Sequence, residues 1–152
     1  MLEQDFRDAV RGVWNSWIDG REAIRGRSGW GSGKGAPDLS IAVRGKIIPV
    51  ELKRAKLLKN GCLRLSESDN HEDQAKWHAE AANAGIFTFH LVGLLHPPTV
   101  GGWRAFPMLK PHQNEPLHEL HEINMDQRFT KELIAWIDDH QPIIPAGLHA
   151  WR

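Results

Sequence analysis

The feature that most constrains this chain is the segment from Gly35 to Lys56, in which two short apolar runs flank the triplet Arg44-Gly45-Lys46. Two such runs joined by a short glycine-containing connection are typical of a β-hairpin. Side chains alternate between the two faces of a strand, so the apolar residues of both runs share one face. These residues are Leu39, Ile41, Val43, Ile48, Val50 and Leu52. The pattern predicts a sheet that turns one face of this hairpin to a hydrophobic core.

The opposite face of the hairpin carries charged side chains that a buried sheet does not normally contain. The same alternation places Asp38, Glu51 and Lys53 together on that face. Carboxylates bind Mg²⁺, which completes its coordination with water and substrate phosphate oxygens. A bound metal activates water, and a nearby ammonium offsets charge on the phosphate. The hairpin therefore predicts metal-assisted phosphodiester hydrolysis, with Asp38 and Glu51 as metal ligands and Lys53 as the cation.

These residues also resemble a known family. Pro37-Asp38, a gap and then Glu51-Leu52-Lys53 look like the signature of the PD-(D/E)xK nuclease superfamily, and the lead-in at 31–35 resembles that of Holliday junction resolvases and VRR-NUC-type nucleases. The resemblance implies that Asp38, Glu51 and the main-chain carbonyl of Leu52 bind Mg²⁺ or Mn²⁺, while Lys53 assists hydrolysis. It extends to Gln74 on a following helix and implies a restriction-endonuclease-like mixed sheet flanked by helices.

Two observations keep an alternative open. A surface hairpin with an Asp turn and a solvated Glu-x-Lys pair would have the same sequence pattern without any catalytic role. Pro49 also departs from the family pattern, because it removes a backbone donor from a strand that the family would bury centrally. We therefore expect either a bulge at Pro49 or incomplete pairing of this strand.

The N-terminal segment Glu3 to Ile18 is predicted to be a helix, since its apolar residues recur every three or four positions. The family often adds a catalytic acid from such a helix. Glu3 fits that placement best, with Asp8 and Glu22 as alternatives. Acidic residues at the start of a helix also stabilise the helix dipole without any catalytic role.

Basic residues flank the hairpin on both sides. Residues 19–36 form a glycine-rich loop in which Arg27 and Lys34 are candidate DNA contacts, and Arg54 and Lys56 follow the proposed site. Residues 1–64 carry 13 Lys and Arg against 7 Asp and Glu, whereas residues 65–152 carry 6 against 12. A basic half around the site matches the electrostatic requirement of a phosphate backbone, unless the two halves mix in space.

The remaining pattern predicts an alternation of helices and strands. We expect a helix from His71 to Asn83 ending at Gly85, a strand from Ile86 to Leu95, a short edge strand from Trp103 to Met108 and a helix from Asp126 to His140. Residues 109–124 read as an irregular connector, in which His118 and His121 alone are a weak metal pair. The whole chain is expected to form one α/β domain, with a core at about 3–108 and a C-terminal helix and tail at 109–152.

Composition narrows the setting. No run approaches the ~18 consecutive apolar residues of a membrane span, and Cys62 is the single cysteine. We expect a soluble cytoplasmic protein without a membrane partner. The expected function is a Mg²⁺- or Mn²⁺-dependent DNA endonuclease, selective for junctions or branched DNA if it forms a homodimer. The alternatives are a catalytically silent DNA-binding module in a larger complex and a small protein-interaction domain.

Overall fold

The computed structural model describes residues 3–14, 23–25, 39–43, 46–66, 71–95, 102–111 and 114–141. The helices in this part of the chain are α1 (Glu3–Val13), α2 (His71–Asn83) and α3 (Phe129–His140), with a short 3₁₀ turn, η2 (Leu117–Glu119). The strands are β1 (Ala23–Arg25), β2 (Leu39–Val43), β3 (Lys46–Leu57), β4 (Cys62–Leu65), β5 (Phe89–Leu95), β6 (Trp103–Met108) and β7 (Glu115–Pro116). They form one mixed sheet flanked by helices, which confirms the predicted α/β class. None of the described helices is long and apolar enough to cross a membrane.

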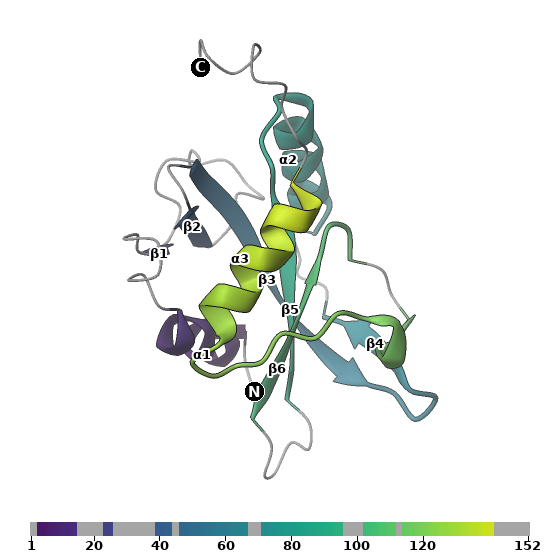
Figure 1. Ribbon diagram of the computed structural model, residues 1–152. Helices are drawn as coiled ribbons and strands as arrows, with labels where there is room; N and C mark the ends of the chain where they lie inside the picture. The colour runs from purple at the N-terminus through teal and green to yellow at the C-terminus, as the bar shows by residue number, and fades with distance from the viewer. Residues whose placement is uncertain are drawn as a thin grey trace.

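Strand β3 is the centre of the sheet (Figure 1). Val50 pairs with both Leu39 of β2 and Phe89 of β5, and Ala55 pairs with both Leu65 of β4 and Leu94 of β5. Strand β5 therefore runs parallel along one edge of β3, while β2 and β4 share the other edge at its two ends. Strand β6 continues the sheet beyond β5, and β1 and β7 extend it beyond β2 and β4.

The larger hydrophobic cluster lies on the face of the sheet that α1 and α3 cover (Figure 1). It contains the six apolar hairpin residues predicted from the alternation, together with Phe6 and Val10 of α1 and Phe129, Leu133 and Trp136 of α3. Helix α1 approaches β5 closely at Gly93, where an added Cβ would lie 2.4 Å from the Phe6 ring. The glycine thus lets an aromatic ring rest directly on the sheet.

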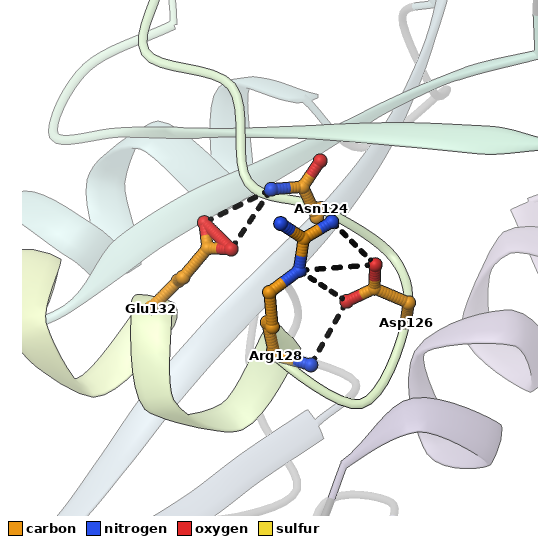
Figure 2. Close-up of polar contacts among 4 residues, drawn as sticks. All are labelled: Asn124, Asp126, Arg128 and Glu132. Carbon is orange, nitrogen blue, oxygen red and sulfur yellow. Dashed lines mark hydrogen bonds and ion pairs between the residues drawn. The ribbon is translucent and has the colours of Figure 1, made fainter.

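A set of polar contacts fixes the start of α3 (Figure 2). The Asp126 carboxylate accepts a hydrogen bond from the backbone N–H of Arg128 at 2.8 Å and pairs with its guanidinium at 2.7 Å. The Asn124 amide donates to Glu132 at 2.9 Å. These contacts give the chain its turn into the helix, so that Phe129 enters the core at the first helical position.

Helix α2 lies against the opposite face of the sheet, where its side chains contact β3 and β5. It spans the residues predicted for it and ends at Gly85, whose φ is +80°. The N–H of Gly85 donates to Ala82 and that of Ile86 donates to Ala81, which is the Schellman pattern at a helix C-terminus. A second hydrophobic cluster, including Ala55, Leu63, Val92 and Phe106, fills the rest of this face.

Several local predictions differ from the structure. The predicted loop at 19–36 contains strand β1, and the basic run after Lys53 continues β3 and turns back into β4. In the structure, the strand predicted at 86–95 and the helix predicted at 126–140 each begin three residues later than predicted. Helix α1 ends at Val13, and residues 15–18 of its predicted range lie outside the described residues. Local residue preferences did not indicate β1 or β4, because these short strands are defined by their pairing with β2 and β3.

Pro49 is accommodated without a bulge. Ser66 donates to the carbonyl of Arg54 on the edge of β3 that β2 and β4 share. Since backbone groups alternate in direction along a strand, Val50 also faces that edge and the nitrogen of Pro49 faces the edge of β5. Pairing with β5 begins only at Val50. The proline therefore removes no ladder hydrogen bond, which explains how it occupies a central strand.

Candidate active site

The polar face of β3 carries two charged residues at positions where a sheet normally places apolar ones. Glu51 is 1% exposed and Lys53 is 7% exposed. They lie two residues apart on one strand, so both side chains leave the same face, opposite the larger hydrophobic cluster. Burial of a carboxylate and an ammonium costs free energy unless each finds strong partners. Two buried charges on a central strand therefore indicate a functional site better than a stabilising one.

Helix α2 holds the Lys53 side chain. The Lys53 ammonium donates a hydrogen bond of 2.7 Å to the side-chain carbonyl of Gln74, 21 residues along the chain. Gln74 lies near the start of α2, the helix that connects β4 to β5 in the chain. This helix lies over the polar face of β3. This contact brings together two residues that the sequence had assigned to one site, and it orients the ammonium while leaving its other N–H donors available.

Two histidines complete the described part of this cluster. His90 on β5 is the pairing partner of Glu51 and is 8% exposed. Its ring packs against that of His78 on α2, with centroids 4.6 Å apart, and His78 Nδ1 is hydrogen-bonded to the Thr88 hydroxyl. Neighbouring strands in register place His90 and Glu51 on one face about 5 Å apart at their Cα atoms. The half-buried ring of His78 thus packs inside this cluster.

Both imidazoles are neutral at physiological pH. Burial, reinforced by the charge of Lys53, lowers the pKa of His78 from 6.5 to about 4. Burial, followed by the effects of His78 and Lys53, lowers the pKa of His90 to about 3. Among the described residues, His78 Nε2 and His90 Nδ1 are buried without a hydrogen-bond partner. A neutral imidazole has one N–H donor and one lone pair, so the cluster contains hydrogen-bonding capacity that no described residue uses.

The backbone of Leu52 lies between two parts of β3 that pair with described strands. On the edge that β2 and β4 share, the described residues pair with β3 up to Val50 and again from the hydrogen bond between Ser66 and Arg54. The alternation of carbonyl directions puts the Leu52 carbonyl on this edge, between the two ladders. The residues directly before β2 lie outside the described residues, so the role that the family resemblance assigns to Leu52 stays a prediction.

The described residues fit a hard divalent cation in part. Glu51 supplies a carboxylate and Leu52 a carbonyl, which are oxygen donors of the kind that Mg²⁺ and Mn²⁺ take. Across the described ranges, no three His, Cys, Asp or Glu side chains come close enough to hold a metal by themselves. A complete site therefore needs at least one further ligand, and Asp38 lies outside the described residues.

The other predicted site residues fall into two groups. Arg27, Lys34 and Glu22 lie outside the described residues, and Glu3 is the first residue of α1. Asp8 is exposed and pairs with Arg11 at 3.6 Å. Arg54 and Lys56 belong to the described strand β3, but the alternation turns them to the face opposite Lys53. Any contact they make with DNA is thus separate from the Glu51 cluster.

Sequence reasoning missed His90. The residue stands inside Phe89-His90-Leu91-Val92, which was interpreted as an apolar central strand. The available signal was a single polar residue at a position that the strand would bury. Its importance depends on the parallel pairing of β3 with β5, which no local pattern specifies.

Comparison with solved structures gives a structural likeness. The chain is similar to the 1.6 Å structure of Hjc from Archaeoglobus fulgidus, a Holliday junction resolvase from an archaeal hyperthermophile. The two are 24% identical with a TM-score of 0.39, and the match covers 68% of this chain and 73% of that chain. No family model matches the chain, and neither does any curated protein.

Proposed function

We propose that this protein is a divalent-metal-dependent nuclease that hydrolyses phosphodiester bonds in DNA. The observation that carries the proposal is the buried Glu51-x-Lys53 pair on the polar face of β3, with the Lys53 ammonium held 2.7 Å from Gln74. A cation fixed by a neutral amide keeps its charge available for a substrate anion. Nothing in the packing of the hydrophobic core requires either charge.

In the proposed mechanism Glu51, Asp38 and the Leu52 carbonyl hold Mg²⁺ or Mn²⁺. Asp38 is assigned because it directly precedes Leu39, which pairs with Val50, the residue before Glu51. The bound ion would lower the pKa of a water molecule and offset charge on the phosphate. Lys53 donates to the attacking water or to a phosphate oxygen, and Gln74 keeps its ammonium in place. Glu3, Asp8 and Glu22 remain the candidates for a further acid.

The first test is cleavage of plasmid and linear duplex DNA with Mg²⁺, with Mn²⁺ or with EDTA. Asp38→Asn, Glu51→Gln and Lys53→Met are each expected to lower the cleavage rate by about 10²-fold or more, because each removes a group that acts on the reacting phosphate. Glu80→Gln and Lys131→Met make the same chemical changes at exposed helix positions and should cleave like wild type. Wild-type rates in Glu51→Gln would refute the assignment.

The substrate form requires a second comparison. We propose branched DNA, with Arg27 and Lys34 as contacts next to the site and Arg54 and Lys56 as contacts on the other face of β3. Four-way junctions, flaps, single strands and plain duplexes of matched length should therefore be cleaved at different rates, with junctions fastest. Equal rates on all four would refute selectivity for branches, and binding without cleavage would leave a silent DNA-binding module.

A further inference from the structure

The histidine beside Glu51 has the properties of a metal ligand. His90 is more than nine-tenths buried, and its Nδ1 has no hydrogen-bond partner within the described ranges. A buried nitrogen without a partner is unfavourable, so a binding partner at this position would stabilise the protein. Its strand partner across the parallel ladder is Glu51, so the imidazole and the carboxylate leave neighbouring positions of the same face.

We propose that His90 is an additional ligand of the cation bound at Glu51, and that its nitrogen makes the site prefer Co²⁺ over Mg²⁺. This inference rests on the proposed function, because it assumes that Glu51 binds a divalent ion. Mg²⁺ takes oxygen ligands almost exclusively, whereas an imidazole nitrogen favours the later first-row ions.

The surroundings of His90 support a ligand role over simple packing. Its ring is held against the ring of His78, which is itself fixed by the bond to Thr88. Such indirect restraint is what sets the orientation of a ligating histidine. A purely structural position on this strand would be filled by an apolar residue, like Val92 and Leu94 on the same face.

The test is pulsed electron paramagnetic resonance of Mn²⁺ bound to the purified full chain, which detects a directly ligated imidazole through coupling to ¹⁴N. We expect this coupling in the wild type and its loss in His90→Asn, with Mn²⁺ still bound. Titration calorimetry should show the affinity of His90→Asn for Co²⁺ reduced roughly tenfold or more and the affinity for Mg²⁺ nearly unchanged. His140→Asn, at an exposed histidine of α3, is the matched control and should retain both properties.

Three outcomes would overturn the inference. Mn²⁺ that binds in a Glu51-dependent way without ¹⁴N coupling would show a site made of oxygen ligands only, and this result needs no His90 variant to fold. Coupling that survives in His90→Asn but disappears in His78→Gln would show that the ligand is His78 and not His90. Binding of Mn²⁺ that is unaffected by Glu51→Gln would show that Glu51 does not bind the metal. That result would refute the proposed metal site and, with it, the role of His90.

Discussion

Mild acid should destabilise this protein through its two buried histidines. In the unfolded chain both imidazoles take up a proton as the pH falls through 6.5, whereas in the folded protein the pKa of His78 is about 4 and that of His90 about 3. Between these values the unfolded state binds more protons, so the free energy of unfolding decreases as the pH decreases. The loss begins near pH 6.5 and continues until the folded-state pKa values are reached.

The magnitude follows from the linkage relation. Between about pH 7 and about pH 5, a histidine that stays neutral only when folded lowers the free energy of unfolding by about 2 kcal/mol. His90 contributes this amount in full because it is almost completely buried. The share of His78 is reduced to about half because its ring is partly exposed to solvent, which gives a total of about 3 kcal/mol.

The assay is urea unfolding, followed by tryptophan fluorescence at a series of pH values in EDTA. The double variant His78→Gln/His90→Asn retains every other titrating group, so the difference between the two proteins isolates the histidines. We expect the wild type to lose about 3 kcal/mol more than the variant between about pH 7 and about pH 5. Parallel curves for the two proteins would refute the reasoning.

Three further substitutions test the fold and the site. Gly93→Ala should destabilise the protein by about 1–3 kcal/mol in urea unfolding, since the new Cβ overlaps the Phe6 ring, whereas Gly102→Ala has open space and should change stability by less than about 0.5 kcal/mol. Gly85→Ala should cost about 1 kcal/mol, because an alanine is strained at a φ of +80°; an unchanged transition would contradict the Schellman end of α2. Lys53→Met should raise the pKa of both buried histidines in proton NMR titrations, as it removes a neighbouring positive charge. An unchanged pKa in the variant would show that the charge of Lys53 does not act on the two histidines.

Much of the site could be predicted because its information is local. The alternation along 39–43 and 46–53 placed the apolar residues of the hairpin in the core and Glu51 with Lys53 on the other face, as the structure confirms. The limits of α2 were predicted equally well, since a helix ending at a glycine in the left-handed region is specified by adjacent residues. In both cases the residue pattern within one element is enough to determine which side chains are buried or where the element ends.

The rest depends on contacts between distant segments. The bond from Lys53 to Gln74 and the position of His90 beside Glu51 both require that β5 pairs with one edge of β3 while β2 and β4 divide the other. Residue preferences along a strand do not specify which strand pairs with it, because pairing is decided by how the two hydrophobic clusters and the helices pack together. The sequence by itself therefore identifies most of the candidate site residues. The packing of the sheet determines which of these residues lie next to one another.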